Sequence, residues 1–540
     1  MATPTLIQHV STQPDVPTID NTPGNNFPVI FPNASLSGNT LICVVAYPSG
    51  ATPSISDNQG NTWPSSGAAG TVTADDGGGN MALQAFVLFN ATAGTQTITV
   101  NFGNTAQIPV RLWASEYNNI SSGTIQANAH AAGVNASGTV SPGAMSGQPN
   151  NCLILAFMSD SNQGGTTNPT LISANTGAGF ALNDADISWS TGSGLPSASQ
   201  FFVQGTSAPI TGSFTLTSGG TETYNVIAFA LSSGSQGTSK PAGIHIDRLL
   251  FFSVNSLPAT WKLQIPGTGN LGFLGTNTDV NGTGAITATD SDSTTWTNRG
   301  QSGGPIFLER DNIGSASATR TISLTIAAGG QGSAMSGMRY FDISGAATAP
   351  FDKTAFVAGG PGGGTNNQAD APDITPSTAN GLVIAILNNG LGPTVGLTSP
   401  SGAIFDEPLY EQAQFVGGIT TTTLTVASTT WGTISNGQQE ISGSGVTVGT
   451  TIQSGAGPTY TIRPSQSVTS GTTMVEYAGD GNTTTWGNGC AHIYNANTSA
   501  LNFTWSIANQ PSGAGGGGPA GAIAFKPAPA ATGATIAWVT

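Results

Sequence analysis

The sequence predicts an all-β protein of two tandem jelly-roll or lectin-like β-sandwich domains, and three observations support this class. Short apolar runs rich in Val, Ile, Phe and Thr recur along the chain, and some alternate with period two, as in residues 95–100 (TQTITV) and 319–326 (TRTISLTI). Clusters of Gly, Asn, Asp, Ser and Pro separate these runs at the spacing typical of sandwiches and barrels. No long helical stripe with capping residues is present. The predicted strands include residues 41–47, 81–89, 95–102, 153–158, 214–217, 318–326 and 382–387.

The amino-acid composition excludes some classes of protein. The 540 residues include 75 glycines, and only 7% are charged, against about 25% in ordinary soluble domains. The net charge of −15, with 11 basic residues scattered along the chain, excludes an electrostatic surface for nucleic acid. The hydrophobic residues, 37% of the chain, arrive in regular clusters, which argues against disorder.

Targeting signals and cysteines add two expectations. No apolar run is long enough for a membrane helix, and the start (MATPTLIQHV) lacks the basic and apolar regions of a signal peptide. We therefore expect no membrane insertion and, for a chain that acts outside the cell, synthesis in the cytoplasm and release by lysis. Cys43, Cys152 and Cys490 lack CxxC spacing and are interpreted as small buried hydrophobes, with a Cys43–Cys152 disulfide as the less favoured alternative.

An internal duplication defines the predicted domains. Residues 150–157 (NNCLILAF) correspond to 380–387 (NGLVIAIL), and residues 57–63 (DNQGNTW) are followed much later by 289–296 (TDSDSTTW). We predict domain 1 at 1–235, with 1–37 as either a first strand or an anchoring arm. A Gly/Ser/Pro linker at 236–241 follows, then domain 2 at 242–530 and a tail at 531–540.

The second copy contains an insertion at residues 420–474 that has no counterpart in the first copy. It carries its own β rhythm, with SNG, SGSG and SGAG as turn sequences. A small module inserted at a loop tip is tolerated when its ends lie close together. We predict a small, protruding β module.

Several sequence motifs resemble those of known protein repeats. The N-x-L entry at Asn39, the turn at 57–63, the strand end EYNNI at 116–120 and the close AIAFKP at 522–527 resemble lectin-like sandwich repeats of bacteriophage virion proteins. The insertion is similar to a small β module of phage tail and fibre proteins, through ISGSGVTVGTTI (441–452) and YTIRPSQSV (460–468). The resemblance implies a virion surface or adhesion role and assigns no functional residue.

The acidic clusters of the sequence could be calcium ligands or turn residues. None has the spacing of a calcium-binding loop, and Asp and Asn commonly bond their own backbone in solvated turns. We therefore expect turns rather than a metal site at Asp75 and Asp76, at Asn183, Asp184 and Asp186, and at Asp290 and Asp292.

Other candidates for chemistry are equally weak. Asp406, Glu407 and Glu411 are interpreted as an exposed loop rather than a glycosidase pair, which needs two converging carboxylates. The glycine runs at 359–364 and 513–518 lack the Lys-Ser/Thr of a phosphate loop. His9, His130, His245 and His492 lie far apart without a local ligand partner. Trp63, Trp296 and Trp486 could stack on sugars, but core packing is favoured for the first two because they recur at matching positions.

These observations favour a non-enzymatic virion structural protein without catalytic, cofactor or metal residues, whose ligand-binding residues are unknown. It would be a head or tail fibre or a capsid decoration protein on the virion surface. The expected partners are other virion proteins, a host-surface glycan and further copies of the chain, because open sandwiches expose edge strands. The alternatives are a secreted bacterial carbohydrate-binding adhesin and a glycan depolymerase.

Overall fold

The computed structural model describes 22 stretches of the chain, and every structural statement below refers to them: residues 2–12, 26–77, 80–103, 110–121, 123–136, 138–161, 171–186, 196–217, 222–254, 260–266, 270–278, 286–300, 305–313, 319–326, 335–357, 368–389, 394–406, 410–434, 440–447, 450–478, 487–507 and 520–529.

The all-β prediction is confirmed. Thirty-six strands and a single 3-10 turn, Thr176–Ala178 (η1), make up the described secondary structure. The predicted strand at 214–217 has the observed bounds of β15, and the one at 41–47 lies within β3. No helix among the described residues is long and apolar enough to cross a membrane.

The strands fall into four units of eight, which follow one another along the chain. Unit 1 contains β1 (Thr5–Thr12), β2 (Asn26–Ile30), β3 (Thr40–Pro48), β4 (Ser54–Asp57), β5 (Thr71–Asp75), β6 (Met81–Leu88), β7 (Thr97–Asn101) and β8 (Arg111–Asn118). Unit 2 contains β9 (Ala127–Ala136), β10 (Thr139–Val140), β11 (Cys152–Asp160), β12 (Leu171–Ala174), β13 (Ala181–Asp186), β14 (Ser197–Gln204), β15 (Phe214–Thr217) and β16 (Glu222–Ser232). Together they form the first half.

The second half repeats this pattern. Unit 3 contains β17 (His245–Val254), β18 (Thr260–Pro266), β19 (Leu271–Thr278), β20 (Ile286–Asp290), β21 (Thr297–Asn298), β22 (Ile306–Asp311), β23 (Thr319–Ile326) and β24 (Met335–Ser344). Unit 4 contains β25 (Ala346–Val357), β26 (Gln368–Asp370), β27 (Gly381–Asn389), β28 (Thr394–Ser399), β29 (Ile404–Phe405), β34 (Gly487–Asn495), β35 (Thr504–Ile507) and β36 (Ala520–Pro527).

All four units share one strand order. In unit 1 the large sheet runs β1-β8-β3-β6-β5 and the small sheet β2-β7-β4, and each later unit repeats this order with its own eight strands. The order 1-8-3-6 facing 2-7-4 is that of a jelly roll, in which two Greek keys form a double sheet. The duplication seen in the sequence is thus a duplication of a pair of sandwiches.

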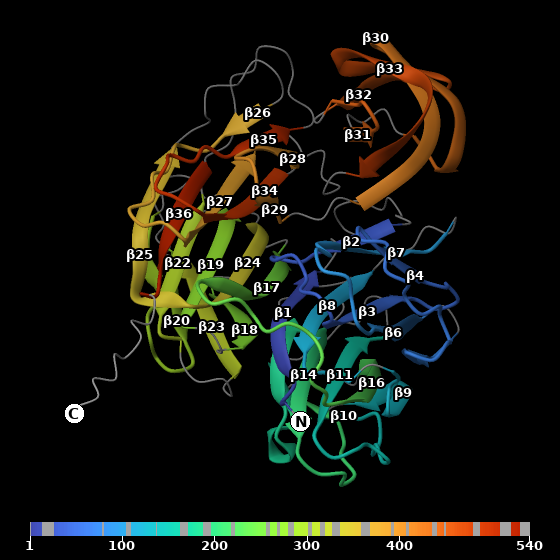
Figure 1. Cartoon of the computed structure of the whole chain (residues 1–540), viewed down its shortest axis with the longest axis vertical. Helices are drawn as coiled ribbons and strands as arrows, with labels where there is room; N and C mark the ends of the chain where they lie inside the picture. Colours follow the sequence, from blue (N-terminus) through green and yellow to red (C-terminus); the bar gives the residue numbers. More distant parts are fainter. Residues whose placement is uncertain are drawn as a thin grey trace, which may run out of the picture.

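The two halves are joined through their first strands. β1 and β17 pair in parallel, with His9 opposite Arg248, and this pairing fuses the large sheets of units 1 and 3 into one ten-stranded sheet. Figure 1 shows β1 and β17 side by side at the centre of the molecule, with the first half in blue to green and the second in green to red. Part of the 1–37 segment is therefore a strand of the central sheet.

Within each half, the large sheets of the two units pack face to face. Alternate residues of β3 serve two cores: Leu41, Cys43 and Val45 face the small sheet of unit 1, whereas Ile42 and Val44 face unit 2. The second half repeats this on β27, where Leu382 and Val383 belong to different cores. Each half is thus a stack of four layers, and strands buried on both faces explain the continuous apolar runs.

The three cysteines are free and buried, as expected for small hydrophobes. Cys43 lies in the core of unit 1, and Cys152 in the separate core of unit 2. Burial raises the pKa of Cys43 to about 12, so this thiol is unreactive.

The predicted linker is fixed rather than free. The Thr238 N–H donates to Asn39 Oδ1 at 2.7 Å, and the Thr238 hydroxyl donates to the Ser37 carbonyl at 2.9 Å. Gly237 has a φ of +93°, and a Cβ there would lie 2.1 Å from Asn39 Oδ1, so only glycine fits.

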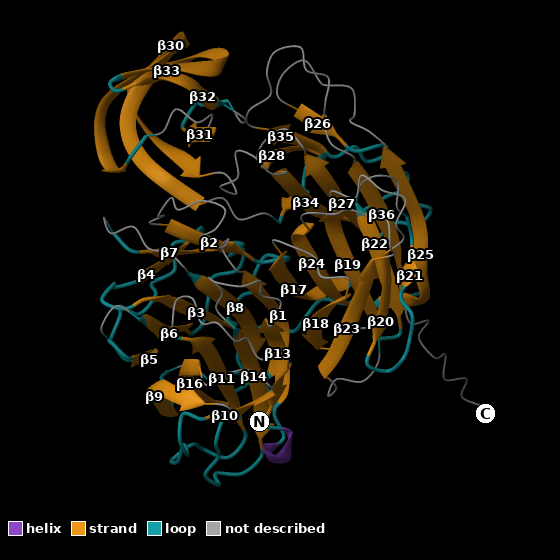
Figure 2. Cartoon of the chain, turned by 180° about the vertical axis from the view of Figure 1, so that it is seen from behind, coloured by secondary structure: helices purple, strands orange, loops and turns teal. Residues whose placement is uncertain are grey.

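The inserted module consists of β30 (Tyr410–Gly432), β31 (Glu440–Gly443), β32 (Thr451–Ala456) and β33 (Thr459–Ala478). Its core is its own and includes Phe415, Leu424 and Ile462. β30 pairs with β2 only at Asn26–Glu411, which attaches the module to the small sheet of unit 1. In Figures 1 and 2 the module projects at one end of the molecule, beside β2 and β7.

We expect the module to be removable. Tyr410 and Ala478 are paired partners in the β30–β33 ladder, so their Cα atoms lie within about 5.5 Å and a short turn can join them. Replacing residues 412–476 by a two- to four-residue Gly/Asn turn should change the free energy of unfolding of the rest by less than about 2 kcal/mol, because no large core is shared. Calorimetry against the full chain checks this, and loss of cooperative unfolding would contradict it.

Candidate functional site: the polar junction between the halves

Buried polar side chains gather where the two halves meet. The strands at the centre of the ten-stranded sheet, β8, β1, β17 and β24, carry His9, Arg111, Arg248 and Asp342, all at most 2% exposed. In a chain with so few charges, this concentration away from water makes the junction the candidate site.

Asp184 on β13 is the centre of the first cluster. Its Oδ2 accepts from Arg111 at 2.9 Å and from the indole N–H of Trp113 at 2.9 Å. Its Oδ1 accepts the hydroxyl of Ser199 and lies 3.3 Å from His9 Nε2. The second guanidinium nitrogen of Arg111 lies 3.1 Å from Asp186 Oδ2. One arginine therefore binds two carboxylates that β13 presents to the large sheet of unit 1.

A second set of contacts crosses between the halves. Arg248 of β17 binds Asp342 Oδ2 at 2.9 Å and also donates to Asn183 Oδ1 at 3.3 Å. The Asn183 amide in turn donates to the Tyr117 hydroxyl at 3.3 Å. Units 1, 2 and 3 therefore share one polar network.

The network explains opposite pKa shifts on two neighbours. Burial alone would raise the pKa of Asp184, but the hydrogen bond and charge of His9 and the charge of Arg111 outweigh it and hold that pKa at about 2. For His9, burial dominates and lowers the pKa below the ordinary 6.5, despite the nearby Asp184. His9 is therefore neutral at neutral pH.

This neutral histidine predicts destabilisation by acid. Because its pKa is lower in the folded than in the unfolded chain, the unfolded state takes up a proton first, and stability is lost as the pH falls below about 6.5. The variant His9→Gln, which stays uncharged, should lose less unfolding free energy than the native chain between about pH 6.5 and 4.5. Urea unfolding across this window tests it, with the exposed His130→Gln as control; parallel pH profiles for His9→Gln and the native chain would refute it.

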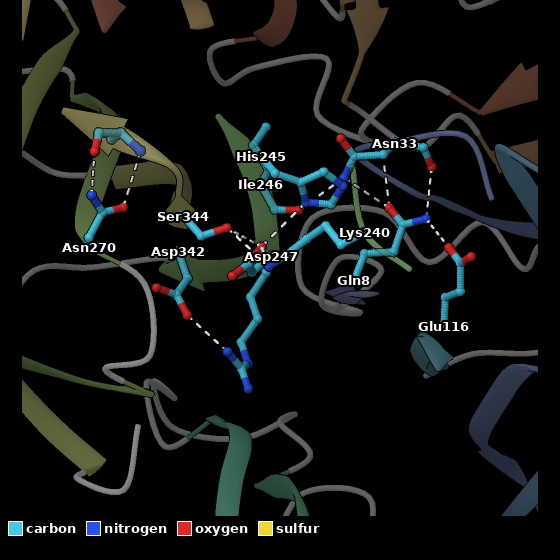
Figure 3. Close-up of polar contacts among 12 residues, drawn as sticks. Gln8, Asn33, Glu116, Lys240, His245, Ile246, Asp247, Asn270, Asp342 and Ser344 are labelled. Atoms are coloured by element: carbon cyan, nitrogen blue, oxygen red, sulfur yellow. Dashed lines mark hydrogen bonds and ion pairs between the residues drawn. The ribbon is translucent and has the colours of Figure 1, made fainter. Parts of the chain in front are cut away.

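A third network lies on the other side of β1 and is shown in Figure 3. Glu116 accepts from Gln8 at 2.7 Å, from Asn39 at 2.5 Å and from the Leu36 N–H at 2.8 Å, and burial raises its pKa. Gln8 Nε2 also donates to the Asn33 carbonyl at 2.9 Å, and the Asn33 amide donates to the Ile246 carbonyl at 2.9 Å. These bonds tie the segment after β2 to β17.

Beside this network, Asp247 is contacted by three donor groups. Lys240 Nζ lies 2.7 Å from Asp247 Oδ1, the Ser344 hydroxyl donates at 2.9 Å, and His245 Nδ1 lies at 3.3 Å. The Lys240 and His245 contacts lower the pKa of Asp247 against the opposing effect of burial. Lys240 belongs to the linker, so this group fixes the linker to unit 3.

The last cluster is a buried Asp–His pair in unit 4. His492 Nδ1 lies 2.9 and 3.0 Å from the two carboxylate oxygens of Asp406, and its Nε2 donates to the Pro32 carbonyl of unit 1 at 2.8 Å. Asp406 follows the fifth strand of unit 4 and Asp184 lies on the fifth strand of unit 2, each beside the sixth strand.

Sequence-based interpretation of these residues was wrong in two places. Asn183, Asp184 and Asp186 are not a solvated turn: they lie on β13 and are buried, because Arg111 and Arg248 supply their partners. Asp406 is not in an exposed loop but is 1% exposed beside His492. Three of the four histidines also have an aspartate partner, of which only Asp247, two residues after His245, was close enough in sequence to be noticed.

The other acidic residues have structural roles. Asp290 pairs with Arg310, and Asp292 binds Arg320 at 2.8 Å, so arginines occupy both carboxylates. Asp75 accepts the Ser49 hydroxyl and the Gly77 N–H, as in the expected turn. Glu411 lies in β30. Glu407, Trp486 and the glycine runs at 359–364 and 513–518 fall outside the described residues.

The two tryptophan turns confirm the prediction of core packing. Trp63 and Trp296 are buried in the cores of units 1 and 3. Their indole N–H groups donate to Asp57 at 2.8 Å and Asp290 at 3.3 Å, each six residues earlier. The second turn therefore makes the same bond although its sequence departs from D-x-x-G-N.

The polar contacts at the junction attach parts of the same molecule to one another. The donor and acceptor atoms of Asp184, His9, Asp406 and His492 face one another and are closed to solvent, so they hold sheets together without facing a substrate. Within the described stretches, no three His, Cys, Asp or Glu residues converge as metal ligands would. No protein-family model matches the chain, and no curated protein is similar to it.

Proposed function

We propose that the chain is a non-enzymatic structural protein of a bacteriophage virion, displayed on the particle surface as a head or tail fibre or as capsid decoration. The observation that carries the proposal is the construction of the molecule: four sandwich units in two fused stacks, with a separate small module at one end. A rigid body with an added module suits display on a particle, and the sequence motifs resemble those of virion proteins.

The module is the proposed attachment surface for a host glycan. Its exposed strand positions are rich in hydroxyl groups and poor in charge, including Thr420, Thr423, Thr425, Thr459 and Thr461. Hydroxyl side chains can both donate to and accept from sugar hydroxyls. Its attachment to the body through one strand pair lets it vary without disturbing the large cores.

We further propose that the chain forms a homo-oligomer, a trimer or an array, and contacts other virion proteins. β5 and β21 end the ten-stranded sheet, and partners would cover such edges. A monodisperse monomer by light scattering at micromolar concentration would contradict this part of the proposal.

Immunogold electron microscopy on a lysate with intact particles tests the virion assignment. Gold on heads or tails supports it, and the position separates decoration from fibre. Gold on cell envelopes with bare particles would overturn it in favour of a bacterial adhesin, and release of reducing sugar from host polysaccharide by the purified chain would favour a depolymerase. Antibody pre-adsorbed with the purified chain is the control.

A further inference from the structure

His492 lies where three parts of the molecule meet. Asp406 is followed by the inserted module, whose first strand begins at Tyr410, and His492 lies on β34, the strand that follows the module. Pro32 belongs to the segment after β2 of unit 1, and β2 is also the strand to which the module pairs. The His492 ring therefore connects the root of the module, the sheet of unit 4 and the first half.

The surroundings of the ring specify its protonation. The Pro32 carbonyl 2.8 Å from Nε2 can only accept a hydrogen bond, so Nε2 carries a proton. Nδ1 lies almost equally far from both oxygens of Asp406, at 2.9 and 3.0 Å, as expected for one N–H shared by a carboxylate. Asp406 Oδ2 also lies 3.7 Å from the Cys490 thiol, a further donor, which favours the ionised carboxylate.

We propose that His492 is an imidazolium, and that its buried ion pair with Asp406 is a latch that holds the root of the module and the second half against the Pro32 carbonyl of unit 1.

The His9–Asp184 pair in the first half shows why the two histidines differ. His9 Nδ1 lies 2.7 Å from the Ser115 hydroxyl, which can donate to a ring nitrogen without a proton. Asp184 already has Arg111 as its cation. His9 can thus be neutral, with Nδ1 accepting from Ser115 and Nε2 facing Asp184 Oδ1 at 3.3 Å, whereas a neutral His492 would place a lone pair against either a carboxylate or a carbonyl.

The other groups around His492 are compatible with the charged form. Tyr494 packs edge-on against the ring at 5.7 Å between centroids, and its pKa is raised by burial with help from Asp406 and Asp247. The pKa of Cys490 is also raised by burial and by Asp406, with Arg339 of β24 opposing. Tyr494 and Cys490 therefore stay neutral donors.

Nitrogen NMR of the ¹⁵N-histidine-labelled full chain measures the protonation directly. At about pH 7 we expect two protonated nitrogens for His492 and only one for His9. The nitrogen signals that disappear in the His492→Gln variant are those of His492. A lone-pair nitrogen on His492 at this pH would overturn the proposal.

A matched variant separates charge from hydrogen bonding. In Asp406→Asn, the amide N–H can donate to Nδ1 of a neutral imidazole, and the bond from Nε2 to Pro32 survives. We expect hydrogen exchange of residues 26–36 near the native rate in Asp406→Asn and about tenfold faster in His492→Gln, because a charge-assisted hydrogen bond is lost. Native-like exchange of residues 26–36 in His492→Gln would overturn the latch even if His492 is charged.

Discussion

Replacing Arg111 by methionine is expected to lower the free energy of unfolding by about 3–5 kcal/mol. Arg111 is 1% exposed, and its guanidinium holds Asp184 at 2.9 Å and Asp186 at 3.1 Å. Without it, two buried carboxylates lose the cation that offsets their transfer from water. The change also removes packing, because the guanidinium lies 5.2 Å from the centre of the Trp113 ring.

Urea unfolding at neutral pH measures this loss. The control is Lys353→Met on an exposed residue of β25, where the change should stay within about 0.5 kcal/mol. A loss below about 1 kcal/mol for Arg111→Met would show that the network contributes little.

The triple variant Arg111→Met, Asp184→Asn, Asp186→Asn distinguishes lost charge from lost packing. If unpaired carboxylates are the cause, neutralising both should restore more than half of the loss, because amides cost less to bury than charges. Strong non-additivity in this cycle is expected for residues in one network. If nothing is restored, the packing of Arg111 on Trp113 dominates.

The fold could be predicted from the sequence because local residue patterns specify the strands. Runs such as LICVVAYP and CLILAFMSD are short, β-branched and bounded by turn residues, and they became β3 and β11. The pairing of β1 with β17 was not accessible, because parallel strands more than 200 residues apart leave no periodic signal. The four-unit repeat was hidden because the motifs matched unit 1 with unit 3 and unit 2 with unit 4, as in 150–157 with 380–387, but never the two units of one half.

The junction could not be predicted for a different reason. Asp184 and Asp406 each look like a surface residue, because an aspartate is buried only when distant partners supply donors. Those donors, His9, Arg111 and His492, lie 73 to 175 positions away in the sequence and on other strands. Only His245 and Asp247 share a strand closely enough to show the pattern. Charged residues inside apolar strands, such as Arg111 and Glu116 in RLWASEYN, were the available signal.

The stacking of the two large sheets within a half leads to a second prediction with a large expected effect on stability. Phe157 of β11 points away from the core of unit 2 and towards unit 1, with its ring 5.7 Å from Trp113 and 6.2 Å from Phe229. Phe157→Ala should lower the free energy of unfolding by about 3–5 kcal/mol, because the site is fully enclosed and cannot collapse.

The distribution of that loss reveals whether units 1 and 2 unfold together. If the interface couples them, hydrogen exchange should quicken in both β3 and β11, since each lines the shared core. The matched control, Phe202→Ala on the opposite face of unit 2, removes a half-buried ring beside Phe180 and should cost about 1–2 kcal/mol without touching β3. Exchange that quickens only in β11 after Phe157→Ala would mean that the two sandwiches of the first half unfold independently.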